Sequence, residues 1–233
     1  MPWHAKPDYG YTISSTEGHD NILMMNGQLN AAGYELAAQA ALIAVSCNEG
    51  SLNPWLWQYG TTPMVGEYTG YGLFQYTPFD KYIDNPTAMA LPGYGPNRSR
   101  TSITVGALET DGWAQMAFMI EGYAGWFPDI WRWGAWDETE YPVEYAAYQG
   151  LISRWGVNGE VTQDIFKTIT NIEDAVIAFM GGYEGSANPG YYSNAVSLAR
   201  NDVWPILSGD TPPSPPGPPT LTRKGMPIWM YLI

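Results

Sequence analysis

An apolar, alanine-rich stretch at residues 34–48 constrains the fold of this chain more than any other segment. Alanine and leucine favour a helix, and apolar side chains here occupy most of its faces. Because such a helix has no polar side to expose, we expect it to lie at the centre of the molecule. Glu49 stands at its end, and a polar turn bounded by Gly50 and Pro54 follows.

Capping residues and hydrophobic periodicity predict further helices on both sides of this segment. Ser14 and Glu17 form a Ser-x-x-Glu capping pattern at the start of the first helix, which we expect to stop at Gly33. The remaining predicted helices cover residues 78–83, 109–122, 142–155, 162–169, 171–183 and 191–207.

Helical periodicity is lost between residues 51 and 77, where glycines alternate with aromatic residues that favour strands. This pattern predicts a small β-hairpin. Residues 85–108 are rich in Pro and Gly and predict a long loop. The expected fold class is therefore α+β, and predominantly α.

Charge limits the partners that this chain can have. Ten basic residues against 23 acidic ones give a formal net charge of −13, which argues against nucleic acid as a partner. No segment approaches about 18 consecutive apolar residues, so we expect no transmembrane helix. The 11 Trp and 17 Tyr residues combine a flat apolar face with a polar group, which suits sugar binding and core packing alike.

Metal-binding and disulfide patterns are missing from the sequence. Cys47 is the single cysteine, and His4 and His19 are the two histidines. One cysteine forms no disulfide within the chain, and these residues lack the spacing of a metal motif. We therefore expect no metal and no cofactor, and we interpret Cys47 as a buried structural residue.

The composition changes abruptly after residue 207. Residues 1–207 predict one folded domain, and residues 208–219 form a proline-rich linker that has no means of packing into a core. Residues 220–233 form an apolar C-terminal tail that needs burial elsewhere. We expect this tail to dock on a partner protein; a membrane surface or the start of a second domain are the alternatives.

Two motifs carry the functional prediction. The first, NEGSLNPWLWQ at residues 48–58, begins at the end of the central helix, and the second, GYGLFQYTP, spans residues 70–78. Together they resemble the helix-end Glu and the Gly-Leu-x-Gln motif of the lysozyme superfamily, which includes goose-type lysozymes and lytic transglycosylases. In their extended form they are most similar to phage tail lysozymes. The resemblance covers about residues 14–207 and implies a lysozyme-like fold.

The resemblance also implies roles for individual residues. Glu49 matches the catalytic Glu and is expected to be the general acid, with a pKa raised by apolar surroundings. Gln75 matches the Gln of the second motif, which helps to bind substrate. Tyr76, Tyr71 and Trp57 are further candidates for contact with the sugar chain.

The second carboxylate decides the reaction. Glu67 lies on the expected hairpin and is our candidate for the base that activates water; Asp80 and Asp84 are alternatives. Without such a base, Glu49 alone is expected to act first as acid and then as base. The 6-hydroxyl of the sugar would then attack, as in a lytic transglycosylase.

The implied function is a peptidoglycan glycosidase that cleaves β-1,4 links between MurNAc and GlcNAc during wall penetration by a phage. An acidic enzyme is repelled by anionic walls, so the charge favours one that is carried there in a larger particle. We expect it in the virion at the tail tip, bound to other tail proteins through the C-terminal tail. The alternative is a structural tail-tip protein with a lysozyme-like fold and no catalysis.

Overall fold

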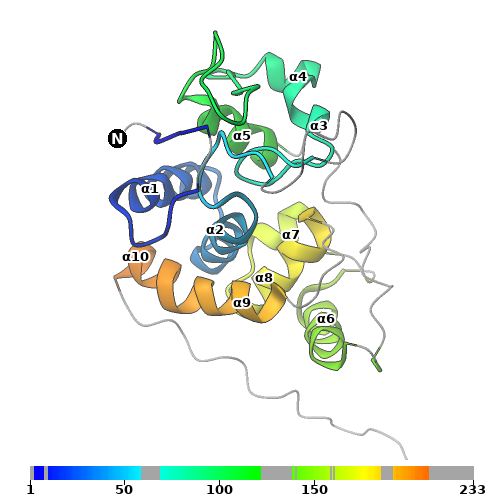
Figure 1. The fold of residues 1–233 in the computed structure, drawn as a ribbon. Helices are drawn as coiled ribbons and strands as arrows, with labels where there is room; N and C mark the ends of the chain where they lie inside the picture. The colour runs from blue at the N-terminus through cyan, green and yellow to red at the C-terminus, as the bar shows by residue number, and fades with distance from the viewer. Residues whose placement is uncertain are drawn as a thin grey trace, which may run out of the picture.

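The computed structural model describes residues 3–7, 10–58, 69–121, 138–139, 141–157, 159, 161–184 and 191–209. Within these residues the protein is predominantly α-helical (Figure 1). None of the described helices is both long and apolar enough to cross a bilayer.

Helix α2 (Leu36–Gly50) is the centre of the fold, as its sequence predicts. Ten consecutive residues, 37–46, are buried on every face of this helix. It packs against α1 (Thr16–Ala31) on one side and against α8 (Ile172–Phe179) and α9 (Tyr191–Leu198) on the other (Figure 1). Alanine makes this enclosure possible, because its small side chain lets neighbouring helices approach closely from all directions.

The first helix begins one residue later than the capping pattern predicts. Ser15, not Ser14, is the N-cap of α1, and its hydroxyl accepts a hydrogen bond of 3.0 Å from the Gly18 amide. The chain is tightly packed where it enters the helix: a Cβ on Gly18 would lie 2.0 Å from the Thr12 carbonyl oxygen, so glycine permits this contact. Gly33 follows the helix with φ +80°, the left-handed conformation expected of a glycine stop.

The C-terminal half supplies the other helices around α2. They are α6 (Pro142–Trp155), α7 (Gln163–Lys167), α8, the π-helical turn η1 (Met180–Glu184), α9, the π-helical turn η2 (Ala199–Val203) and α10 (Trp204–Ser208). Thr162 and Asn171 cap α7 and α8 through their side chains, as predicted. The Asp174 carboxylate is buried and accepts hydrogen bonds from Arg154 and from the Trp155 indole, which ties α6 to α8.

A smaller lobe lies beyond the C-terminal end of α2 and contains α3 (Asp80–Ile83), α4 (Pro86–Met89) and α5 (Asp111–Ile120) (Figure 1). Most of the expected loop 85–108 is irregular, except for α4. The predicted β-hairpin is not confirmed. In its place the described residues show an antiparallel bridge between Trp57 and Tyr71, and residues 59–68 lie outside the described part.

Candidate active site

Glu49 lies in the last turn of α2, where the helix leaves the core. Ser51 and Leu52 follow with φ of 44° and 56°, so the chain reverses through two consecutive left-handed residues. The Glu49 side chain is partly exposed, and burial raises the pKa of its carboxyl group above the ordinary value of 4.5. Among the described residues, no ion pair or hydrogen bond engages this carboxylate. The environment thus favours the protonated, uncharged form.

The structure brings the two sequence motifs into direct contact. A Cβ on Gly50 would lie 2.4 Å from the Leu73 carbonyl oxygen and 2.5 Å from that of Gly72, so only glycine permits this approach. One turn earlier, the Ser46 hydroxyl donates a hydrogen bond of 2.8 Å to the same Leu73 oxygen. The end of α2 is therefore fixed against the backbone of the second motif.

Gln75 lies within this second motif and has φ 44°. Its amide nitrogen donates to the carbonyl oxygens of Leu56 (3.2 Å) and Gly72 (3.0 Å). Its Oε1 atom is buried and has no hydrogen-bond partner in the described structure. Because this oxygen is buried, a ligand does not reach it in this conformation, although the side chain as a whole is partly exposed. Gln75 remains a candidate for substrate binding.

Tyr71 and Tyr76 lie in the core and do not face a cleft. Their exposed fractions are 0% and 1%. The Tyr71 hydroxyl donates to Asp111 (3.2 Å), and the Tyr76 hydroxyl donates to the Gln115 carbonyl (3.1 Å). Because α5 covers this segment, both rings lack a surface that a ligand could touch, and we no longer assign them to substrate binding.

Trp57 is the one predicted aromatic contact that keeps an exposed surface. Its ring packs edge-to-face on Tyr71 and Phe79, with centroid distances of 5.0 and 5.4 Å. Its indole nitrogen donates to the Asn97 carbonyl at 2.8 Å, and the Arg100 guanidinium lies 5.7 Å above the ring. The indole is therefore held rigidly, as a stacking surface for a sugar has to be.

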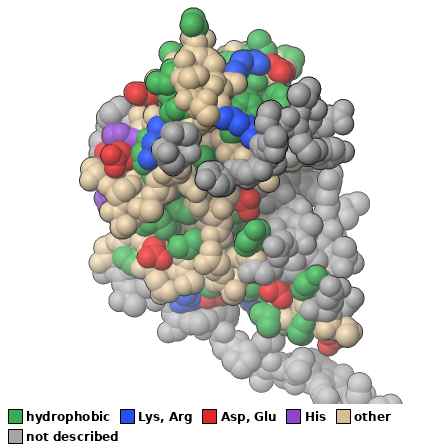
Figure 2. All heavy atoms as spheres, viewed as in Figure 1, with side chains coloured by type: hydrophobic (Ala, Val, Ile, Leu, Met, Phe, Trp, Pro, Cys, Tyr) green, Lys and Arg blue, Asp and Glu red, His purple; other side chains and the backbone are tan. Residues whose placement is uncertain are grey.

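Cationic side chains are also found in this lobe. Arg98 and Arg100 belong to the loop that follows α4, and Figure 2 shows Lys and Arg side chains mainly in the upper part of the face that it displays. Within residues 69–121 the cations Lys81, Arg98 and Arg100 are outnumbered by five acidic residues, so this lobe is acidic like the whole chain.

The described residues leave the second carboxylate open. Glu67 lies outside them, in the segment 59–68. Asp80 is exposed at the start of α3, and Asp84 forms an ion pair of 2.8 Å with Arg98. No cluster of three or more His, Cys, Asp or Glu side chains able to hold a metal is present in the described residues.

Asp111 and Gln115 are site residues that the sequence analysis missed. Both are fully buried on α5. Burial raises the pKa of the Asp111 carboxyl to about 6, although hydrogen bonds from Gly95, Gln115, Tyr82 and Tyr71 act in the opposite direction. The available signal was an Asp and a Gln four residues apart within an otherwise apolar helix, a spacing that places both on one face.

The N-terminal arm fastens the turn that follows Glu49. The Asn53 amide nitrogen donates to the Lys6 carbonyl at 2.7 Å, while its Oδ1 accepts from the Lys6 amide at 3.3 Å. In the same way, Asn21 bonds to both backbone groups of His4 and also donates to the Leu52 carbonyl, each at 2.8 Å. Two buried asparagines thus join the arm to the left-handed turn.

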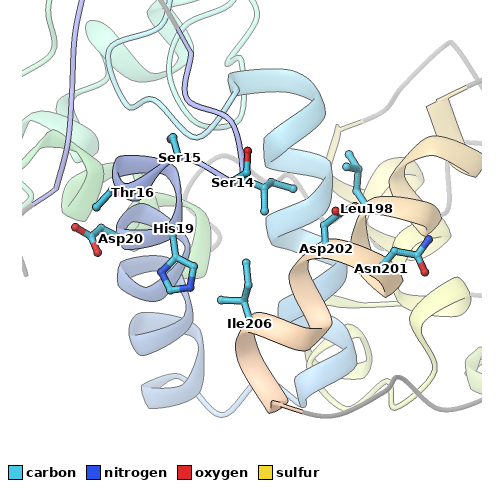
Figure 3. Close-up of a pocket in the computed structure, with 10 residues that line it drawn as sticks. Ser14, Ser15, Thr16, His19, Asp20, Leu198, Asn201, Asp202 and Ile206 are labelled. Carbon is cyan, nitrogen blue, oxygen red and sulfur yellow. The ribbon is translucent and has the colours of Figure 1, made fainter.

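A cavity of about 670 Å³ lies elsewhere, between the start of α1 and the segment η2–α10 (Figure 3). Its lining includes Ser14, His19, Asn201, Asp202 and Ile206. None of the predicted site residues lines it. We therefore place the candidate site at the end of α2, where Glu49 and both motifs meet.

Comparison with models of known protein families and with curated proteins finds no match to this chain. The functional assignment consequently depends on the residues and geometry described above.

Proposed function

We propose that this protein cleaves glycosidic bonds in peptidoglycan, with Glu49 as the general acid. One observation carries the proposal: a partly buried carboxyl group with a raised pKa and no ionic partner among the described residues stands at the junction of the two motifs. Cleavage of a glycosidic bond needs an acid that keeps its proton until it reaches the leaving oxygen. The apolar end of α2 supplies such a setting.

In the first step Glu49 gives its proton to the glycosidic oxygen while the bond from C1 to that oxygen breaks. Positive charge develops on C1 and the ring oxygen of the MurNAc unit. In the hydrolytic route, Glu67 takes a proton from water as the water oxygen bonds to C1. The partly exposed side chains of Trp57 and Gln75 support binding of the sugar chain beside this reaction.

A second route needs no second carboxylate, and the surroundings of Asp84 and Asp111 favour it. Asp84 is paired with Arg98, and Asp111 is fully buried. If Glu67 does not face Glu49, ionised Glu49 itself takes the proton of the C6 hydroxyl, whose oxygen attacks C1. The product is then a 1,6-anhydro sugar, and the protein is a lytic transglycosylase.

The net charge and the order of the segments indicate how this enzyme would reach the cell wall. An acidic enzyme does not concentrate by itself on an anionic wall, but delivery in a larger particle removes that need. We propose that the protein is carried in a phage tail, with residues 220–233 as the docking segment beyond the proline-rich linker.

A zymogram with embedded peptidoglycan tests the chemistry. We expect Glu49→Gln to fold normally and to lose at least about 100-fold in wall clearing, because the amide has no proton to give. Glu35→Gln is the matched control, since Glu35 is exposed at the other end of the same helix. Mass spectrometry of the fragments separates the routes: reducing ends indicate water, and anhydro ends indicate internal attack.

Two results would overturn the proposal. Full clearing by the Glu49→Gln variant would remove its catalytic role. A wild-type protein that binds glycan and leaves it intact would indicate instead a structural tail-tip protein.

A further inference from the structure

Gln115 lies between the two motifs and bonds to both. Its Oε1 accepts a hydrogen bond of 2.7 Å from the Leu73 amide of the second motif. Its Nε2 donates to the Pro54 carbonyl of the first motif at 2.6 Å and to the Asp111 carboxylate at 2.7 Å. The side chain is 0% exposed, so its amide touches the protein and not a ligand.

The orientation of this amide is determined by its partners. Leu73 offers a hydrogen-bond donor, whereas Pro54 and Asp111 offer acceptors, so a flipped amide would place like groups together. Asp111 is itself held by the Gly95 amide at 2.9 Å and the Tyr82 hydroxyl at 2.8 Å. One oxygen and both N–H groups of Gln115 are therefore satisfied in a single arrangement.

Backbone packing makes the arrangement tight. A Cβ on Gly72 would lie 2.2 Å from the Gln115 Oε1 atom, so the glycine of the second motif lets the chain close on this amide. Gly72 also has φ +82°, a conformation that other residues rarely adopt. The length of the Gln115 side chain thus sets the distance between the backbones at residues 54 and 73.

We propose that Gln115 is a positioning residue: it fixes the separation between the Glu49 turn and the Gly72–Gln75 segment, and Asp111 fixes its orientation. This inference rests on the proposed function, because the two motifs carry the acid and the substrate contact. A displacement of about 1 Å at such a junction is enough to reduce catalysis about 100-fold. A polar core residue needed for folding alone would lack that effect.

Two variants distinguish a positioning role of Gln115 from a role in folding alone. Gln115→Glu keeps the shape of the side chain. While protonated, its carboxyl group can accept from Leu73 and donate to one acceptor. Once ionised it loses this single donor and faces the Asp111 carboxylate. The other titratable groups at this position are the hydroxyls of Tyr71 and Tyr82 on Asp111 and that of Tyr76 on the Gln115 carbonyl. Gln115→Met retains the volume and has no donor at any pH.

The measurement is kcat and KM on soluble glycan fragments between pH 5 and 8, at a temperature at which circular dichroism shows each variant folded. We expect the ratio of Q115E to wild-type kcat to fall at least tenfold over this range, with KM changed less than twofold. For Q115M we expect kcat to be at least tenfold low at every pH. Hydrogen exchange gives a second readout: the Leu73 amide should lose at least tenfold of its protection in Q115M.

The outcomes distinguish this inference from the function on which it rests. If Glu49→Gln is inactive while folded Q115E and Q115M keep wild-type kcat at all pH values, Gln115 has a structural role only and this inference is overturned. If the Leu73 amide keeps its full protection from exchange in Q115M, Gln115 does not set the distance between the two motifs. The inference is then overturned as well. If Glu49→Gln is as active as the wild type, the proposed function itself fails, and the role of Gln115 fails with it.

Discussion

Replacing Gly50 by alanine tests the contact between the end of α2 and the second motif. The new Cβ would lie 2.4 Å from the Leu73 carbonyl oxygen, whereas ordinary contacts begin at 3.4 Å. The backbone of one motif must therefore move by about 1 Å. No side-chain rotation relieves this contact, because the three nearest atoms all belong to the backbone of residues 72 and 73.

The expected cost combines three terms. Overpacking in a well-packed region costs about 1–3 kcal/mol. The same displacement weakens the hydrogen bond from Ser46 to the Leu73 oxygen, which contributes about 1 kcal/mol. In the opposite direction, the higher helix propensity of alanine stabilises the folded protein by about 1 kcal/mol. We expect Gly50→Ala to lower the free energy of unfolding by about 1–3 kcal/mol, although helix propensity alone predicts the opposite sign.

Urea unfolding followed by tryptophan fluorescence measures this difference. Gly27→Ala is the matched control, because Gly27 is exposed within α1 and a Cβ there meets nothing within 4 Å. That control should raise the free energy of unfolding by about 0.5–1 kcal/mol. A Gly50→Ala protein at least as stable as the wild type, alongside a normal control, would refute the close packing on which the site geometry depends.

Three further predictions concern buried polar groups. Because the pKa of Asp111 is raised from 3.8 to about 6, its contribution to stability is fully present below about pH 4 and is lost as pH rises to about 6. In urea titrations Asp111→Asn should reduce this decline with pH by up to about 3 kcal/mol; an unchanged slope would contradict the raised pKa. Asn53→Ala removes both hydrogen bonds to the Lys6 backbone and should lower the free energy of unfolding by about 2–4 kcal/mol. A loss below about 0.5 kcal/mol would show that the N-terminal arm does not fasten the turn. Arg154→Met leaves the buried carboxylate of Asp174 without its cation and should cost about 3 kcal/mol, with faster proteolysis around α6. Proteolysis at the wild-type rate would argue against this link between α6 and α8.

Most of the longer helices follow from local signals in the sequence, whereas the short helix α4 lies in the predicted loop 85–108. The predicted bounds of residues 142–155 agree with α6, and the caps at Thr162 and Asn171 act through their side chains as expected. Such features depend on a few neighbouring residues. The π-helical turns η1 and η2 were not predicted. A wider helical turn leaves no mark in the residue composition or in the capping residues from which helices are predicted.

The site was predictable where it depends on the end of one helix and on a compact motif. Gly50, the residue after Glu49, meets the backbone of Gly72 and Leu73, so the two motifs lie together. Tyr71 and Tyr76 were misplaced because an amphipathic ring serves a cleft or a core equally well, and only the position of α5 decides between them. Gln115 was missed for a different reason: its contacts form only after three segments distant in sequence come together.

The enclosure of α2 has a consequence for mutational tolerance. Its ten consecutive buried residues offer no solvent-facing position at which a charged or bulky side chain could be accommodated. In a saturation library, residues 37–46 should therefore appear as an uninterrupted intolerant block, without the three-to-four-residue rhythm of an ordinary surface helix.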